Sequence, residues 1–426
     1  MSIFTPRSVV ATSALTAALL ALAPAAATAD EHDIPGTAGA TTLTGTPEPP
    51  RPAFYEPPAE IPTTPGTIIR QEKADNVLDP LDVTSASFDA RRVMYASQDR
   101  EGRPIAVTGF VVSPRATWLG KGPRPIISFS VGTQGMGDSC APSRQLRDFT
   151  EYEILAFKGL LLRGYAVALT DYQGLGTPGS HTYMVRAAQG QAVLDMARAA
   201  QRVGVRGLSA ANPIGLMGYS QGGGGAAAAA AELASSYAPE LDIKGTAVGA
   251  VPADLSSAVP RKLDGSLYSA FELYAIVGLF QGYHVDPAAF LNARGLAVLP
   301  KVEQSCTQKL ADLAFVRTST LTKDGRPMHD SFAEEPLRSI LTDNRIGNRK
   351  PSSPVLLTHS MADDVIPFSV GKQLAKDWCA KDATVWFQPL VTPTHVGGAL
   401  PTATYAGTFF EARFRGDKAT GNCAVR

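Results

Sequence analysis

The sequence has few histidines and few cysteines, and its charges cancel. Its 426 residues include six histidines and four cysteines, and 39 basic residues balance 39 acidic ones. A net charge of zero leaves no electrostatic sign of nucleic-acid binding. No Cys-x-x-Cys pair occurs and no histidine lies near a cysteine in the sequence, which argues against a metal site. We therefore expect neither a metal nor a nucleic-acid partner.

Two common nucleotide and metalloprotease motifs are also missing, the P-loop and His-Glu-x-x-His. One glycine-rich segment, Gly174 to Gly179, follows a predicted strand, but Pro178 removes a backbone donor that a phosphate-binding turn needs. Asp195, about twenty residues later, falls in a helical pattern and not at the end of a second strand. We expect no nucleotide and no other cofactor.

The sequence has one long apolar run, Val9 to Ala23, and no second one. The run is shorter than the roughly 20 apolar residues that a membrane span needs. Arg7 precedes it, and the small residues Ala27-Thr28-Ala29 follow as a cleavage site. This pattern predicts a signal peptide over residues 1–29, a secreted extracellular protein and no transmembrane segment.

Secretion changes the interpretation of the four cysteines, which are Cys140, Cys306, Cys379 and Cys423. An even number of cysteines in an oxidising compartment predicts two disulfides. Three pairings are possible, and the spacing does not choose among them.

The most informative motif is Gly218-Tyr219-Ser220-Gln221-Gly222, which lies between an apolar run and a small-residue helix. This G-x-S-x-G pattern is typical of a nucleophile elbow, a turn so tight that its flanking positions need glycine. The turn raises Ser220 Oγ above the sheet edge at a helix N-terminus. There the helix dipole and the N–H of Gln221 can stabilise an oxyanion.

A serine hydroxyl needs a base, and in this architecture an acid and then a histidine follow the serine. Five histidines are poorly placed, because they precede the serine, lie in an apolar strand or fall in a region without strands: His32, His181, His284, His329 and His359. His395 remains, in a loop after the last clear strand, and is the predicted base.

The predicted acid follows the apolar run Pro354 to His359, where Asp363 and Asp364 are adjacent. Either carboxylate could reach His395, and we expect the other to be solvated or to cap the next helix. A second oxyanion donor should come from the loop after an earlier strand. The N–H of Gln134, in a glycine-flanked turn, is the candidate.

Apolar strand-like runs alternate with helical stretches along most of the chain, which predicts a mostly parallel sheet covered by helices. The predicted strands are residues 91–95, 105–112, 125–130, 165–170, 245–251, 354–359 and 385–390, and the predicted helices include 150–163 and 186–202. Between residues 253 and 350 the alternation stops, which indicates a mainly helical insertion.

These patterns divide the chain into a signal peptide (1–29), a Pro-rich linker or strap (30–66), a core (67–252 and 351–426) and an inserted lid region (253–350). Phe54 and Tyr55 suggest that the end of the strap docks on the core. The apolar run from Phe271 to Phe280 either lines an acyl pocket or is a core helix.

The chain resembles the secretory lipase family, over nearly all of the mature sequence. The matching motifs lie in residues 54–58, 132–135, 140–143, 170–176, 218–223, 251–255 and 363–367. The resemblance implies an α/β-hydrolase fold with a large lid, and hydrolysis of carboxylic esters, typically acylglycerols, without a cofactor. It also implies the disulfides Cys140–Cys306 and Cys379–Cys423.

For the site, the resemblance implies Ser220 as nucleophile, Asp363 rather than Asp364 as acid, and His395 as base. The oxyanion donors fall at Gln221 and at Gln134, where the yeast type protein has an acidic residue, so a backbone donor is expected. A short-chain esterase, a peptidase on the same fold and a non-catalytic surface-binding protein are the alternatives. The sequence leaves the acyl-chain length, interfacial activation and the oligomeric state open.

Overall fold

The computed structural model describes residues 50–426, except 75–86, 148–149 and 424–426. The predicted signal peptide (1–29) and residues 30–49 of the predicted strap lie outside these residues. None of the helices in the described part of the chain is both long and apolar enough to cross a membrane.

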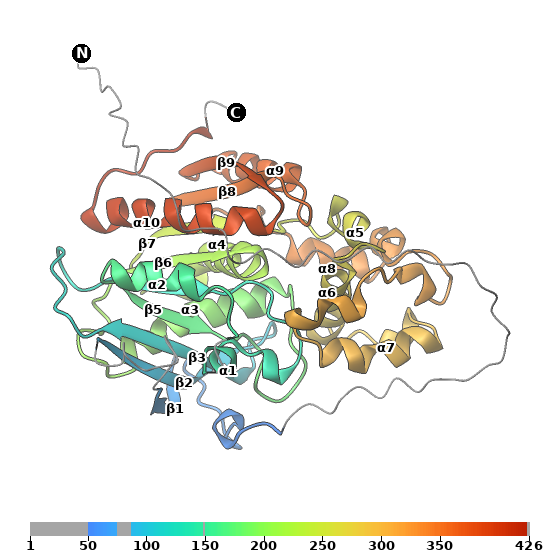
Figure 1. Cartoon of the computed structure of the whole chain (residues 1–426), viewed down its shortest axis with the longest axis horizontal. Helices are drawn as coiled ribbons and strands as arrows, with labels where there is room; N and C mark the ends of the chain where they lie inside the picture. The colour runs from blue at the N-terminus through green and yellow to red at the C-terminus, as the bar shows by residue number, and fades with distance from the viewer. Residues whose placement is uncertain (1–49, 75–86, 148–149, 424–426) are drawn as a thin grey trace, which may run out of the picture. The chain divides into compact units, whose positions relative to one another are not determined.

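The centre of the fold is a nine-stranded sheet with the order β1-β2-β3-β5-β4-β6-β7-β8-β9 (Figure 1). The strands are β1 (Ile68–Lys73), β2 (Phe88–Gln98), β3 (Pro104–Pro114), β4 (Ile126–Ser130), β5 (Ala166–Thr170), β6 (Ile214–Tyr219), β7 (Ile243–Gly249), β8 (Val355–Ala362) and β9 (Val385–Pro393). In this spatial order, neighbouring strands from β1 through β3 to β5 pair antiparallel. Neighbouring strands from β5 through β4 and β6 to β9 pair parallel. The predicted α/β architecture is confirmed.

Helices cover both faces of the parallel part of the sheet, as the uninterrupted apolar strands require. Every residue of β4, β5 and β6 is buried. The helices α2 (Ile154–Leu162) and α10 (Ala399–Arg415) pack on one face, and α3 (Arg186–Arg202) and α4 (Ala228–Tyr237) pack on the other (Figure 1). A further helix, α9 (Phe368–Cys379), contacts α4 through a hydrogen bond from Trp378 to Glu232.

Between β7 and β8 the chain forms helices and turns that contribute no strand to the sheet, and we call residues 253–350 the helical segment. Its elements are α5 (Ala258–Leu263), α6 (Ser269–Gly282), η4 (Pro287–Ala289), α7 (Ala293–Glu303), η5 (Thr307–Leu313), η6 (Thr318–Thr320), η7 (Met328–Ala333) and α8 (Leu337–Asn344). They gather together beyond one end of the strands (Figure 1).

Two local predictions need correction. The predicted helix 150–163 begins only at Ile154, because residues 151–153 form a turn whose side chains hydrogen-bond the loop at residues 132–134. Strand β1 was not predicted, because it lies at the sheet edge with a half-exposed, largely polar sequence and so carries no apolar run.

The end of the predicted strap docks on the core, as expected. Tyr55 is buried, and its hydroxyl hydrogen-bonds Ser143 at 2.8 Å. The guanidinium of Arg92 lies 5.4 Å from the ring centre of Phe54 and 5.7 Å from that of Tyr55. A cation placed over two aromatic faces stabilises this contact.

The structure contains two disulfides. Cys140–Cys306 joins the loop after β4 to the helical segment, and Cys379–Cys423 joins the end of α9 to the C-terminal tail. Both close large loops, with sequence separations of 166 and 44 residues. Crosslinks of this kind restrict the unfolded chain and each contribute roughly 2–4 kcal/mol.

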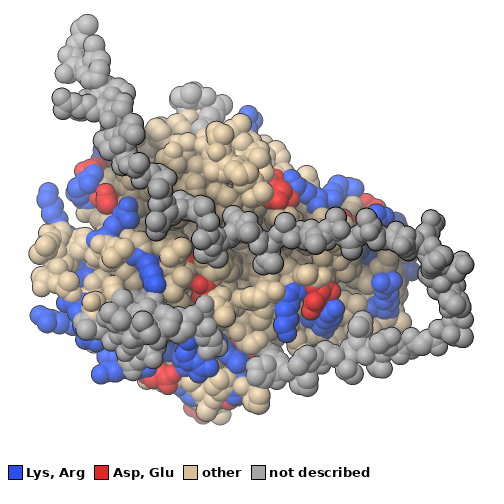
Figure 2. Space-filling model, in the orientation of Figure 1, with Lys and Arg blue, Asp and Glu red and all other residues tan. Residues whose placement is uncertain are grey.

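The surface carries charges of both signs. On the face drawn in Figure 2, basic and acidic side chains of the described residues are interspersed, some of them side by side, with uncharged surface between the groups. Mixed charges agree with the net charge of zero and give this face no extended field of one sign.

Candidate active site

Ser220 sits at the strained turn between β6 and the next helix. Its backbone angles are φ 61° and ψ −131°, a region that a residue with a side chain rarely adopts. The chain then enters a π-helical turn, η3 (Gln221–Ala227), which continues as α4. This geometry matches the elbow predicted from the glycine spacing, and it leaves the first N–H groups of the helix beside the serine.

The structure brings the three residues expected to act together into one hydrogen-bonded line. His395 Nε2 lies 2.8 Å from Ser220 Oγ, and His395 Nδ1 lies 2.8 Å from Asp363 Oδ2. An ionised carboxylate only accepts hydrogen bonds, so Nδ1 carries the ring proton and Nε2 can accept the serine proton. The three residues come from the ends of β6, β8 and β9, which meet at one sheet edge.

Several donors hold the Asp363 carboxylate. The backbone N–H groups of Val365 and Ile366 donate to Oδ1 at 2.9 and 2.7 Å. His359, buried in β8 as expected of a structural histidine, places Nε2 3.4 Å from Oδ2. Burial acts to raise the pKa of Asp363, but the hydrogen bonds from His359 and His395 outweigh it and hold the pKa below its ordinary value. Asp363 is therefore ionised at neutral pH.

The neighbouring Asp364 has a different position from the one expected. It neither lies free in solvent nor caps α9. Its Oδ1 accepts the backbone N–H of His395 at 2.7 Å, and its Oδ2 accepts the hydroxyl of Tyr268 at 3.0 Å. The hydroxyl of Tyr219 donates to the carbonyl oxygen of His395 at 2.6 Å. The two adjacent aspartates thus hold the ring and the backbone of the same histidine.

The loop after β4, at residues 132–134, is held by a second segment, residues 151–153, which we call the 151–153 clamp. The N–H of Gly132 donates to Glu153 Oε2, the hydroxyl of Tyr152 donates to the carbonyl of Thr133 at 3.0 Å, and Gln134 Nε2 donates to Glu151 Oε1 at 3.3 Å. Three successive clamp residues therefore hold three successive loop residues in reverse order.

The acidic members of the clamp are buried and close together. Burial raises the pKa of Glu151 and of Glu153, and the charge of Glu151 raises that of Glu153 further. The charge of Glu153 also acts on three neighbouring tyrosines, Tyr152, Tyr172 and Tyr219. Both clamp carboxyls are therefore harder to ionise than a free glutamate.

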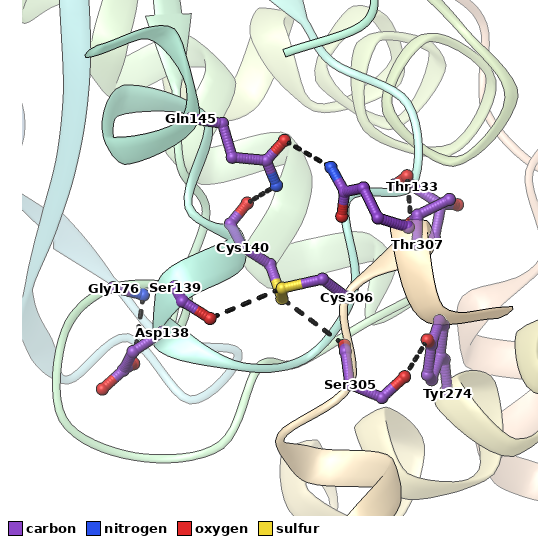
Figure 3. The surroundings of a disulfide bond; sticks show 11 residues. Thr133, Asp138, Ser139, Cys140, Gln145, Gly176, Tyr274, Ser305, Cys306 and Thr307 are labelled. Atoms are coloured by element: carbon purple, nitrogen blue, oxygen red, sulfur yellow. Dashed lines mark hydrogen bonds between the residues drawn. A yellow bond between two sulfur atoms is a disulfide. The ribbon is translucent and has the colours of Figure 1, made fainter. Parts of the chain in front are cut away.

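The helical segment supports the same loop from its other side (Figure 3). Thr307 Oγ1 donates to the carbonyl of Thr133 at 2.7 Å, and the N–H of Thr307 donates to the carbonyl of Gln134 at 2.8 Å. The disulfide Cys140–Cys306 fixes this contact covalently. Gly135, at φ 128°, is required here, because a Cβ would lie 2.3 Å from the carbonyl oxygen of Ser305.

The loop leaves two backbone donors available. Among the described residues, the N–H groups of Thr133 and Gln134 make no hydrogen bond. The side chain of Gln134 is directed to Glu151, while that of Gln221 contacts His181 Nε2 at 3.2 Å. At both predicted oxyanion positions the side chain is therefore occupied elsewhere, and the backbone N–H is the group that remains.

An apolar cavity opens beside Ser220 and encloses about 780 Å³ including its mouth. Its walls come mainly from α5, α6, η7 and α8 of the helical segment and from Val365 and Ile366, next to Asp363. One face of α6 lines the cavity, while Tyr274 and Val277 on another face pack in a core cluster. The run from Phe271 to Phe280 thus lines a cavity with one side of its helix and packs in the core with another.

One acidic side chain belongs to the wall of this cavity. Glu272, in the first turn of α6, is 3% exposed, and neither carboxyl oxygen has a hydrogen-bond partner among the described residues. Burial, assisted by the charge of Asp264, raises its pKa to about 9. Glu272 is therefore a neutral carboxylic acid at neutral pH.

Residues 142–422 match the model of the secretory lipase family. The chain belongs to the secretory lipase family. The resemblance predicted from the sequence motifs is confirmed, and membership makes the chain a carboxylic ester hydrolase of the lipase and esterase kind.

Individual relatives support this family assignment. The chain is 31% identical to a probable inactive lipase of Mycobacterium tuberculosis, over 86% of this chain and 82% of that one. It is 26% identical to Lipase 10 of Candida albicans, over 90% and 84% of the two chains. The crystal structure of Candida antarctica lipase A in its closed state shares the fold, with a TM-score of 0.76 and 23% identity over 87% of each chain.

Sequence reasoning missed the supporting residues of this secretory lipase site. Asp364, Tyr219 and Tyr268 act through contacts with residues far away in the chain, and the 151–153 clamp was assigned to a helix. The signal available for the clamp was its composition, because two glutamates around a tyrosine fit poorly in a buried helix start. Glu272 was hidden inside an otherwise apolar run.

The shifted pKa of Glu272 makes a prediction about stability. Between pH 4.5 and 9 the folded protein retains a proton that the unfolded chain releases, so the free energy of unfolding falls as pH rises through this range. We expect Glu272→Gln to abolish this pH-dependent fall in the free energy of unfolding, because glutamine does not titrate. Its stability advantage over the wild type should grow by roughly 1 kcal/mol per pH unit.

Urea unfolding of both proteins at pH 5.5, 7 and 8.5 measures this difference, and Glu303→Gln, a substitution outside the cavity wall, is the control. A constant difference between Glu272→Gln and the wild type across the three pH values would show that Glu272 is ionised in the folded protein.

Proposed function

We propose that this protein is a secreted serine lipase that cleaves acylglycerols through an acyl-enzyme formed on Ser220. The observation that carries the proposal is the line from Asp363 through His395 to Ser220, with 2.8 Å at each step. Family membership supports ester hydrolysis. The predicted signal peptide and the two disulfides support secretion.

In the first half of the reaction, His395 Nε2 takes the proton of Ser220 as Oγ attacks the ester carbonyl. Asp363 holds the imidazole in the tautomer with the proton on Nδ1 and stabilises the cation that forms. The protonated histidine then gives its proton to the leaving alcohol. In the second half, His395 activates water, which attacks the acyl-enzyme and releases the acid.

The negative charge on the tetrahedral intermediate needs fixed donors. We assign the backbone N–H groups of Gln221 and Gln134 to this role. The N–H of Gln221 opens the helix after the elbow, where the helix dipole adds to it. The N–H of Gln134 makes no hydrogen bond to any described residue and sits in a loop held by two segments, so it needs no reorganisation as charge develops.

The shape of the site supports an apolar acyl substrate. The cavity beside Ser220 is lined almost throughout by carbon, and the helical segment forms most of its wall, so we assign residues 253–350 as the lid. Exposed apolar side chains flank the site residues along the chain: Met361, Val391, Val396 and Leu400. Apolar surface around a lipid-binding cavity favours a lipase over an esterase for soluble substrates.

One relative in the family is named a probable inactive lipase, so activity of this chain needs its own test. Ser220→Ala should lower hydrolysis of a soluble p-nitrophenyl ester by more than about 10³-fold, because it removes the hydroxyl that hydrogen-bonds His395 Nε2. A fluorophosphonate should label the wild type and not this variant, since only an activated serine reacts.

Ser236→Ala, which removes an exposed serine in α4, is the matched control and should retain both labelling and turnover. Turnover above a few per cent in Ser220→Ala, or no labelling of the wild type, would contradict the proposal.

The two adjacent aspartates should differ in effect. Asp363→Asn removes the charge that orients His395 Nδ1 and should lower kcat by about 10³–10⁴-fold. Asp364→Asn keeps an oxygen that can accept the His395 N–H and should lower kcat by less than about 10-fold. Steady-state rates on one soluble ester measure both effects, and similar losses in the two variants would refute these assignments.

The 151–153 clamp should affect the reaction rate rather than substrate binding. Glu153→Ala removes the acceptor of the Gly132 N–H, which frees the loop that presents Gln134. We expect kcat to fall about 10- to 100-fold with little change in KM. Glu153→Gln keeps an acceptor oxygen and should retain most of the rate, and an unchanged kcat in Glu153→Ala would show that the loop does not need this carboxyl.

A further inference from the structure

Glu272 differs from the other buried carboxyl groups in the described part of the chain. Asp171 accepts hydrogen bonds from Thr108 and from the backbone and side chain of Ser143. Other buried carboxyls are held in the same way by side-chain or backbone donors, as Asp195 and Glu232 show. Glu272 is equally buried, but no described protein group donates to either of its oxygens or accepts from it.

Glu272 lines the cavity from α6, and its two carboxyl oxygens lie just beneath the apolar surface of the wall. Ala275, Ile276 and Leu279 line the cavity from the same helix, at the i+3, i+4 and i+7 positions that share a helix face with Glu272. One turn earlier, Tyr268 hydrogen-bonds Asp364. The wall that carries Glu272 therefore adjoins the loop of Asp363 and Asp364, and an acyl chain attached to Ser220 would run along it.

The chemistry of Glu272 restricts what it can recognise. Its charged form is disfavoured by burial and by the charge of Asp264, and the rest of the cavity wall provides no cation. A neutral carboxylic acid offers one O–H donor and one carbonyl acceptor side by side. An alkyl chain can satisfy neither group. A hydroxyl can accept the acid proton and donate to the acid carbonyl at the same time.

We propose that Glu272 selects esters whose acyl chain carries a hydroxyl group, which it binds inside the cavity beside Ser220. This inference rests on the proposed function, because the acyl chain must be placed by reaction at Ser220. A buried polar group left without a partner is costly. A hydroxylated chain therefore binds more favourably than a plain chain, because its hydroxyl hydrogen-bonds the carboxyl of Glu272. The remaining cavity wall is apolar and accommodates the rest of the chain.

The test compares p-nitrophenyl decanoate with its monohydroxy derivatives, a set of isomers that carry the hydroxyl at successive carbons from C3 to C9. We expect at least one isomer to exceed the plain ester in kcat/KM by about 10-fold or more in the wild type, because hydrogen-bonding sites discriminate against analogues that lack the group. Glu272→Gln, which keeps one donor and one acceptor, should retain part of this preference. Glu272→Leu, which has neither a donor nor an acceptor, should lose it.

Ile276→Leu changes the same wall without changing a polar group, and it should leave the preference unchanged. If no isomer is preferred by the wild type, or if the preference persists in Glu272→Leu, the role of Glu272 is overturned while hydrolysis of the plain ester still supports the proposed function. If the wild type hydrolyses neither ester and is not labelled by a fluorophosphonate, the proposed function fails and this inference fails with it.

Discussion

The hydrogen-bonded line from Asp363 through His395 to Ser220 is the constraint on which the rest of the site depends. Each distance is 2.8 Å, yet the residues are separated by up to 175 positions in the sequence. The parallel strands bring them to one edge, and the strained turn lifts the serine toward the imidazole. Asp364 and Tyr219 then hold the N–H and the carbonyl of His395, so ring and backbone are both fixed.

The loop at residues 132–134 shows a second use of long-range support. The 151–153 clamp holds it on one side, and residues 305–307 of the helical segment hold it on the other, with Cys140–Cys306 as a covalent tie. Fixed donors stabilise a developing charge best when they do not have to move. The same contacts connect the helical segment to this loop, so a displacement of that segment at Thr307 would be transmitted to Thr133 and Gln134.

Glu272 illustrates how function and stability oppose each other. A leucine at this position would fit an apolar wall at no polar cost, whereas the buried acid loses hydration without gaining a protein partner. Proteins retain unfavourable groups of this kind mostly where a ligand uses them. The large apolar core and the two disulfides stabilise the folded protein and offset the unfavourable free energy of burying Glu272.

The sequence by itself determined the fold class and the glycine-flanked turn at Ser220, because apolar periodicity and a tight turn are local properties. His395 was expected from the chain order of serine, acid and histidine, and the structure places it 2.8 Å from Ser220. The bounds of α3 follow from its helical pattern in the same way. Only the tertiary structure decided that Asp364 binds the backbone of His395, that residues 151–153 hold a loop twenty residues away, and that Glu272 lines a cavity. These roles are hydrogen bonds between distant segments, and their geometry arises only when the packed sheet and helices bring those segments together.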